Sequence, residues 1–188
     1  MDEKKVKGTF FVEYVRMIKS NKDKDWDRYL KPEDWEFIDG HVMPSFWYPF
    51  EVYQRFGVAI FELIAGGKLE VARVWGQLSA QQQIETVYQG LKNSPDPIKA
   101  VERFIILRKQ FFNFDLFTLE LEILDDKHIK IRVFNLDPQM EGIEPLSHQM
   151  LGFFEKLIEL TGGNNSRVTF EKMIWKGDPE TVVDAVWD

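Results

Sequence analysis

Apolar residues recur at spacings of three and four through the first 112 residues, which predicts a series of helices. We expect helices near residues 9–18, 32–39, 50–64 and 98–112, and one long or two broken helices over 69–91 with Ser79 as a possible cap of the second. The third is apolar around most of its girth, so it should be buried on several sides. Three residues are expected to mark helix limits: Thr9 as a cap, Gly40 as a left-handed helix end, and Gly76 as a candidate break.

At Phe117 the period changes from 3.6 to 2, and apolar residues alternate with polar ones in two runs, 117–123 and 129–133. A turn centred on Asp126 places these runs in an antiparallel hairpin. Ile123 then faces Ile129 on an apolar face. Two pairs of opposite charge face each other on the polar side, Glu122 with Lys130 and Glu120 with Arg132.

A further amphipathic helix begins near Pro145 and is stopped by Gly162 and Gly163. Two strands follow near residues 167–175 and 181–187, joined by the turn sequence KGDPE. The carboxyl half therefore has the order strand, strand, helix, strand, strand. We predict an α+β fold in which a helical amino-terminal part packs on a four-stranded antiparallel sheet. No linker or internal repeat divides the chain, so residues 1–188 are expected to form a single domain.

Composition and charge limit the classes of partner that this protein is expected to bind. The 188 residues are 44% hydrophobic, which indicates a folded protein, and the formal net charge of −7 argues against a nucleic-acid partner. No cysteine is present, which excludes disulfides and thiolate sites and fits a reducing cytoplasm. The longest apolar tract is too short to span a bilayer, and no secretion signal is visible. We expect a cytoplasmic protein without membrane insertion.

Catalytic and metal-binding patterns are not found. The three histidines, His41, His128 and His148, lie far apart without a second ligand at metal-binding spacing. Phosphate loops and the Gly-x-Ser-x-Gly motif do not occur. Glu51 and Glu62 share one helical stripe but would lie about 16 Å apart along it. The expectation is therefore no catalytic residue, no metal and no cofactor.

Aromatic residues give the strongest candidate site. Six of the thirteen residues in PSFWYPFEVYQRF, from Pro44 to Phe56, are aromatic. Such rings either fill a core or line a flat-walled apolar pocket. The rings from Phe50 onward suit the core, whereas those from Phe46 to Tyr48 are expected in a loop where they could border a cavity. The candidate ligand-binding residues are Phe46, Trp47, Tyr48, Tyr53, Phe56 and Trp75.

Several segments together resemble one known family. They are KGTFFVEYV, GHVMPSFWYPFEVYQRF, RVWGQLSAQQQIETVYQGL, LTGGNNSRV and the terminal KGDPETVVDAV. The chain resembles the vinyl-4-reductase-like domains, within the superfamily that includes haem nitric-oxide sensors and vesicle-tethering transport-particle subunits. The resemblance implies the same α+β fold, and a small-molecule sensor or a dimeric interaction module rather than an enzyme.

The sequence also departs from this family. The resemblance implies cysteines around the Gly-Asp-Pro turn, but Met173 and Thr181 occupy those places, so a zinc or thiol role is lost. The haem-binding relatives use a helical histidine with a Tyr-x-Ser-x-Arg motif, and that motif does not occur in this chain. Haem is therefore not expected.

Three hypotheses follow for the function. The leading one is a non-enzymatic sensing or regulatory domain that binds an apolar small molecule in an aromatic-lined pocket and shifts between two arrangements. The alternative is a homodimer or a partner-binding module without a ligand, with an interface of roughly 1,200 Å² or more. An enzyme that uses buried carboxylates ranks last, because no nucleophile or cofactor motif supports it.

Overall fold

The structure, a computed structural model, describes residues 3–86, 90 and 96–188. The end of the helix predicted to reach residue 91 and the turn predicted at 94–95 lie outside the described residues. The chain divides into two compact units, residues 1–68 with 109–115 and residues 69–108 with 116–188. Each unit is described by itself, and the single-domain expectation stays a prediction.

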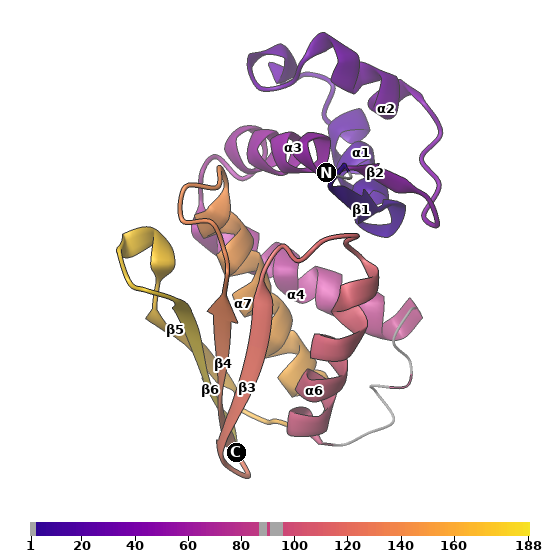
Figure 1. Cartoon of the computed structure of the whole chain (residues 1–188). Helices are drawn as coiled ribbons and strands as arrows, with labels where there is room; N and C mark the ends of the chain where they lie inside the picture. The colour runs from indigo at the N-terminus through magenta and orange to yellow at the C-terminus, as the bar shows by residue number, and fades with distance from the viewer. Residues whose placement is uncertain (1–2, 87–89, 91–95) are drawn as a thin grey trace. The chain divides into compact units, whose positions relative to one another are not determined.

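The amino-terminal unit consists of short helices and one small sheet (Figure 1). Its strands β1 and β2 pair antiparallel, with Val6 opposite Tyr48. The most deeply buried side chains are Phe11 and Ile18 of α1 and Phe56 and Ile60 of α3. The elements are β1 (Lys5–Lys7), α1 (Gly8–Ser20), η1 (Trp26–Arg28), η2 (Pro32–Asp34), α2 (Trp35–Asp39), β2 (Trp47–Pro49) and α3 (Phe50–Leu63).

Two predicted helix limits in this unit are wrong, and its two strands were not predicted. The strands β1 and β2 were not predicted, because three residues are too few to establish a period of two. Thr9 does not cap α1: the helix already begins at Gly8, and the Thr9 hydroxyl donates a hydrogen bond to the Pro44 carbonyl at 3.2 Å. Gly40 has a φ of −71°, which any residue adopts. Glycine is instead required at position 40 by the lack of space, because a Cβ there would lie only 2.7 Å from the Glu36 carbonyl oxygen.

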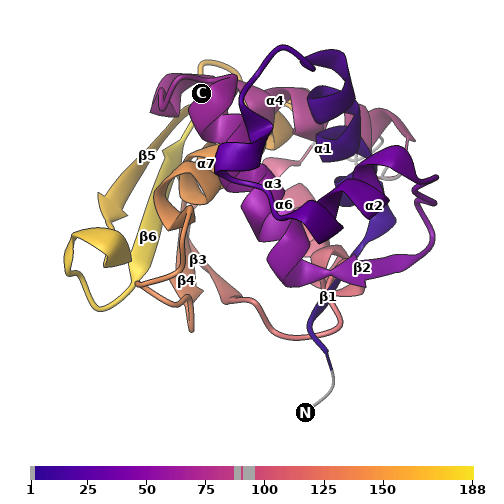
Figure 2. The same ribbon diagram turned by 90° about the horizontal axis from the view of Figure 1, so that it is seen from above.

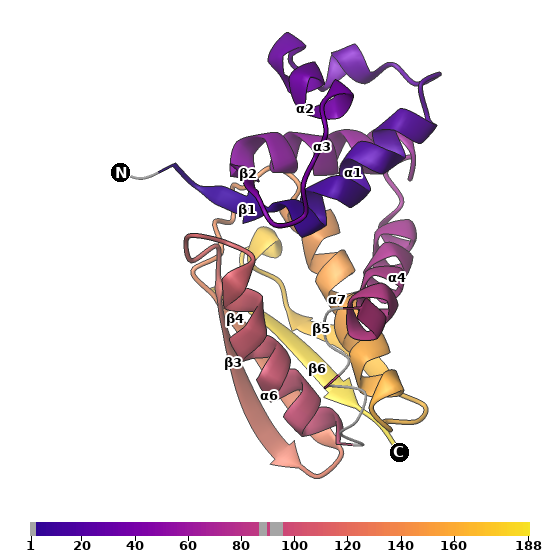
Figure 3. The same ribbon diagram turned by 90° about the vertical axis from the view of Figure 1, so that its right-hand side faces the viewer.

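The second unit is a four-stranded antiparallel sheet with helices on one face, and the predicted α+β fold class is confirmed. Its strands are ordered β3-β4-β6-β5, and α4, α6 and α7 all lie on the same side of the sheet (Figures 2 and 3). The elements are α4 (Leu69–Thr86), α6 (Pro97–Leu107), β3 (Thr118–Asp125), β4 (His128–Phe134), α7 (Ile143–Leu160), β5 (Arg167–Lys172), η4 (Ile174–Lys176) and β6 (Thr181–Val186). A 3-10 turn, η3 (Arg108–Gln110), lies at the boundary of the units.

The predicted hairpin register is confirmed at every predicted pair. Ile123 lies opposite Ile129, Glu122 opposite Lys130 and Glu120 opposite Arg132. The inner face is fully buried along β4 but becomes exposed along β3, where Ile123 is 51% exposed. This gradient follows from the position of β3 at the edge of the sheet.

Helices α4 and α7 cross at two glycines. Of the two alternatives left by the sequence, one long helix or a break at Gly76, the described residues show no break at Gly76. Helix α4 continues through Gly76 to Thr86. A Cβ at Gly76 would overlap the carbonyl oxygen of Gln149, and a Cβ at Gly152 would overlap that of Arg73. The two backbones therefore touch, which is the reason for both glycines. Arg73 of α4 also stabilises this crossing. Its guanidinium donates hydrogen bonds to Glu155 of α7 at 3.0 and 2.8 Å and to the Val168 carbonyl of β5 at 2.9 Å.

Candidate functional site

A large group of aromatic rings lies between α1, α3 and the segment 111–114 of the amino-terminal unit. The Tyr14 and Tyr53 rings stack in parallel with centroids 4.7 Å apart, and Phe10 contacts Phe111 edge-on at 4.8 Å. Phe50 joins α3 to the returning segment through an edge contact with Phe114 at 5.0 Å. We call this group the Tyr53 cluster, consisting of Phe10, Tyr14, Phe50, Tyr53, Phe111, Phe112 and Phe114.

The Tyr53 cluster combines buried and accessible rings. Phe50 and Phe111 are buried, whereas Phe10, Phe112 and Phe114 are only half-buried. The cluster therefore presents aromatic surface from which water is only partly excluded.

Burial and the neighbouring Tyr14 hydroxyl raise the pKa of Tyr53 well above its usual value of 10.0. A tyrosine hydroxyl is neutral at physiological pH even without this shift, and the raised pKa means that it serves as a hydrogen-bonding group rather than as a base. The absence of a side chain at Gly57 leaves room for the Tyr14 ring over α3, because a Cβ at Gly57 would lie 3.3 Å from that ring.

The structure does not bring all six predicted aromatic residues together. Tyr53 lies in the cluster just defined. Tyr48 and Phe56 flank Phe11 at 4.7 and 5.2 Å in a second group of rings, and Phe56 has no exposed surface. Trp75 lies half-buried on α4 of the other unit.

Phe46 and Trp47 lie at the surface, 60% and 39% exposed, and the Lys7 ammonium lies 4.2 Å from the centroid of the Trp47 ring. Trp47 and Tyr48 belong to the strand β2 rather than to a loop. The sequence analysis did not select the other members of the Tyr53 cluster. The run FFNF at 111–114 was a visible signal, but only the fold brings it beside α1.

A buried ion pair holds the segment before α2 against α3. Asp34 is fully buried and accepts hydrogen bonds from Arg55 at 2.6 and 2.9 Å and from the Lys31 backbone N–H at 2.9 Å. Burial alone would raise the pKa of Asp34, but the Arg55 and Lys31 contacts outweigh it, so this pKa is lowered. The arrangement is a structural clamp beside the aromatic groups.

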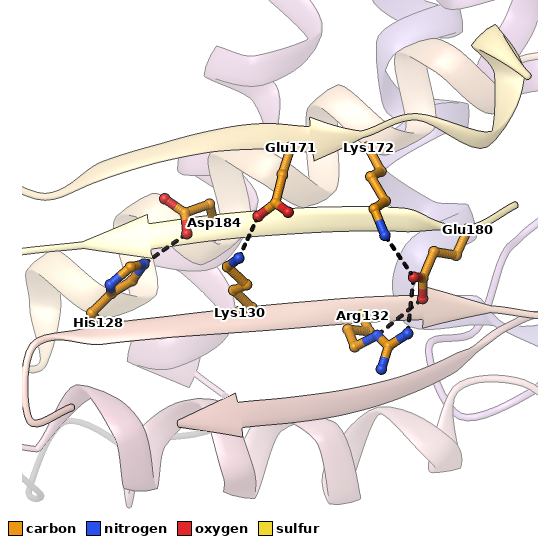
Figure 4. Close-up of polar contacts among 7 residues, drawn as sticks. All are labelled: His128, Lys130, Arg132, Glu171, Lys172, Glu180 and Asp184. Atoms are coloured by element: carbon orange, nitrogen blue, oxygen red, sulfur yellow. Dashed lines mark hydrogen bonds and ion pairs between the residues drawn. The ribbon is translucent and has the colours of Figure 1, made fainter. Parts of the chain in front are cut away.

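Charged side chains cover the outer face of the sheet in the second unit (Figure 4). His128 Nε2 lies 2.7 Å from Asp184 Oδ1, and Lys130 Nζ lies 2.6 Å from Glu171 Oε2. Glu180 accepts hydrogen bonds from Arg132 at 3.0 and 2.9 Å and from Lys172 at 3.3 Å. These contacts link side chains of β4, β5, β6 and the preceding Glu180, and those of Lys130, Arg132 and Lys172 pair positive with negative charge.

The described residues contain no group of three or more His, Asp or Glu side chains arranged to hold a metal ion. Nor does any helix among them combine the length and apolarity needed to cross a bilayer.

The fold is similar to those of solved H-NOX proteins. One is an H-NOX protein from S. oneidensis in the Fe(II)NO ligation state, 10% identical with a TM-score of 0.70, and the match covers 97% of this chain and 99% of that one. Another is the Fe(II) unliganded H-NOX protein from K. algicida, 14% identical with a TM-score of 0.69 and coverage of 97% and 96%. A structure described as "Probing the function of heme distortion in the H-NOX family" matches at 14% identity, a TM-score of 0.62 and coverage of 97% and 95%.

No protein-family model and no curated protein matches this sequence. The likeness to the solved structures therefore shows an H-NOX-like fold and nothing more specific.

The described histidines and Tyr53 are not arranged to hold a haem iron. Haem iron is held by His, by Cys, by Met together with His, or by Tyr. His41 is exposed, His128 is held by Asp184, and the His148 ring packs edge-on against Phe170 at 5.2 Å. Burial lowers the pKa of His148. Cysteine is absent from the sequence, and the raised pKa of Tyr53 disfavours the phenolate that a tyrosine ligand requires.

Proposed function

We propose that this chain is a non-enzymatic sensing or regulatory domain that binds an apolar small molecule other than haem. The observation that carries the proposal is the Tyr53 cluster, in which half-buried rings remain accessible within the unit. The H-NOX-like fold supports a role in sensing, because the neighbours whose names mention Fe(II), NO or heme bind such groups.

The chemistry of the Tyr53 cluster indicates the class of ligand. Phe10, Phe112 and Phe114 offer ring surface, and the Tyr14 and Tyr53 hydroxyls offer hydrogen bonds to one polar group. A carbon-rich molecule with a single hydroxyl, carbonyl or ether function matches this surface. Of the six aromatic residues predicted from the sequence, Tyr53 is the one that we assign to this ligand surface.

The finer family assignment, to the vinyl-4-reductase-like domains, is part of the same proposal. The turn that carries this resemblance is closed without cysteine: the Met173 N–H donates to Asp178 at 2.7 Å, and the Ile174 N–H donates to the Thr181 hydroxyl at 3.2 Å. Gly177 supplies the left-handed conformation of the turn, with φ of 98°. Hydrogen bonds thus occupy the positions at which the resemblance implied cysteines.

We also propose a cytoplasmic location for the protein.

A homodimeric or partner-binding module remains the second candidate. Met43, Phe46 and Trp47 form an exposed apolar surface around the turn before α3, where the Phe46 N–H donates to the Met43 carbonyl. Such surfaces often mark interaction sites. This candidate requires no ligand at the Tyr53 cluster.

Two alanine variants separate the candidates. Phe112→Ala removes a half-buried ring from the Tyr53 cluster, and Phe46→Ala is the matched control, because it removes a ring of the same kind from the surface. Each purified variant is examined by native mass spectrometry for a co-purified compound, after circular dichroism has shown that it is folded. We expect the compound to be retained by the wild type and by Phe46→Ala, and at least tenfold depleted in Phe112→Ala.

The opposite pattern, with retention lost only in Phe46→Ala, would assign binding to the exposed surface instead. Equal retention in both variants would contradict the assignment of the ligand to the Tyr53 cluster.

A further inference from the structure

The strand β3 forms an open edge of the sheet in the second unit. Among the residues that the structure describes, only β4 pairs with it, from Thr118 opposite Phe134 to Asp125 opposite His128. An edge strand leaves alternate backbone N–H and C=O groups unpaired, and these form a template on which another strand can add. With eight residues, β3 is long enough for such an addition.

Negative charge is concentrated along this edge. The stretch 118–126 contains the acidic residues Glu120, Glu122, Asp125 and Asp126 and no basic residue. Glu120 and Glu122 are exposed and lie opposite Arg132 and Lys130 on β4.

The cations of β4 make their short contacts on the side away from β3. Lys130 lies 2.6 Å from Glu171 of β5, and Arg132 donates two hydrogen bonds to Glu180 beside β6 (Figure 4). Glu171 is also the largest cause of the raised pKa of Lys130. The carboxylates of Glu120 and Glu122 are therefore left exposed at the edge, with the opposing cations already engaged elsewhere.

Apolar side chains are exposed at the same edge. Ile123 of β3 is 51% exposed, and Leu121 is half-buried. Helix α6 packs beside β3, and its Ile106 is 68% exposed (Figure 3). A further strand would cover apolar surface on one face of the sheet and meet carboxylates on the other.

We propose that the β3 edge binds an extended segment of a partner protein that carries Lys or Arg at alternate positions. The backbone of this segment adds to β3 as a fifth strand. Its basic side chains face Glu120 and Glu122, and the apolar side chains between them cover Leu121 and Ile123. This extends the alternation of charge across the sheet by one strand, because β3 is acidic and the neighbouring strand β4 is basic on the outer face.

A second copy of β3 is the wrong partner for this edge. Residues directly opposed in an antiparallel pair point to the same face of the sheet, so two β3 strands would place the glutamates of both copies on one face. Like charges opposed in this way are destabilising. The proposal does not depend on which ligand the Tyr53 cluster binds.

The test uses the full-length protein and synthetic eight-residue peptides. The probe is a fluorescently labelled peptide of alternating Lys and Val, and its binding is followed by fluorescence anisotropy. A second peptide has the same sequence with N-methyl groups on alternate residues, which removes strand pairing but keeps the charge. We expect saturable binding of the first peptide and at least tenfold weaker binding of the second.

Two double variants complete the test. Glu120→Gln with Glu122→Gln removes the edge carboxylates, and we expect about tenfold weaker binding for two lost exposed ion pairs. Glu36→Gln with Glu62→Gln removes the same charge from exposed sites of the other unit, and we expect less than a twofold change.

Equal binding of both peptides, or an equal loss in both double variants, would overturn the proposal in favour of general attraction to an acidic protein. Absence of binding by the alternating peptide would overturn it as well, and the glutamates would then serve only to prevent edge-to-edge association.

Discussion

Individual residues in this protein owe their chemistry to their surroundings rather than to their type. The pKa of Tyr53 is raised because the protein buries its hydroxyl beside Tyr14, and Asp34 remains charged, although it is buried, because Arg55 binds it with two hydrogen bonds. The sequence marked Tyr53 as a candidate, since it stands in an unusually aromatic stretch. It could not mark Phe112 or Tyr14 as its neighbours, because they come from positions far along the chain.

The Asp34–Arg55 pair gives a prediction at the residue scale. Asp34 is fully buried and the Arg55 side chain is 17% exposed, so Asp34→Asn leaves a largely desolvated guanidinium without its counter-charge. We expect a loss of about 3 kcal/mol in the free energy of unfolding, measured by urea titration at pH 7. The exposed neighbour Glu33 provides the control, since Glu33→Gln should change stability by less than about 0.5 kcal/mol.

The same pair has a defined pH dependence. The pKa of Asp34 is lower in the folded protein than the unfolded value near 3.8, so its contribution is fully present above that pH and is lost as the pH falls below it. If Asp34→Asn were as stable as the wild type at pH 7, the pair would not stabilise the unit as described.

At the scale of elements, the sequence predicted the hairpin in detail and the small sheet not at all. Alternation over two long runs determined which face of β3 and β4 is apolar, and this fixed the register of the three predicted pairs. It did not determine the ion pairs on the outer face, because Arg132 and Lys130 contact Glu180 and Glu171 from segments later in the chain. Strands β1 and β2 are too short to show a period. Gly76 left a helix break open as an alternative, because a glycine required by a neighbouring helix looks the same in sequence as a helix break.

The close contact between α4 and α7 predicts the direction in which Gly76→Ala changes the stability of the protein. Helix propensity alone favours alanine over glycine by about 1 kcal/mol, so Gly76→Ala would stabilise an isolated helix. In this protein the new methyl group would overlap the Gln149 backbone and force the helices apart. We therefore expect a net loss of about 2 kcal/mol.

Chemical denaturation of Gly76→Ala beside Leu78→Ala measures this effect. Leu78 lies on the same helix but is 60% exposed, so its truncation should cost far less. A more stable Gly76→Ala variant would mean that the two helices do not touch at this glycine.

At the scale of the whole molecule, the order of helices and strands was enough to predict the α+β fold, and the solved H-NOX structures share that fold over 97% of the chain. The function is less accessible from the sequence, because this fold is shared with the H-NOX proteins at identities of only 10 to 16%. We propose a ligand for the aromatic surface of the Tyr53 cluster and a partner for the acidic open edge of β3.

The central claim, an apolar ligand other than haem, is tested most directly by one measurement on the full-length protein. Native mass spectrometry is recorded on freshly purified material, together with its absorption spectrum. We predict an additional mass of a few hundred daltons that is lost on denaturation and that has no haem absorption. A protein that carries haem, or one that carries no bound compound after purification and takes up none from an extract of its host, would contradict the account.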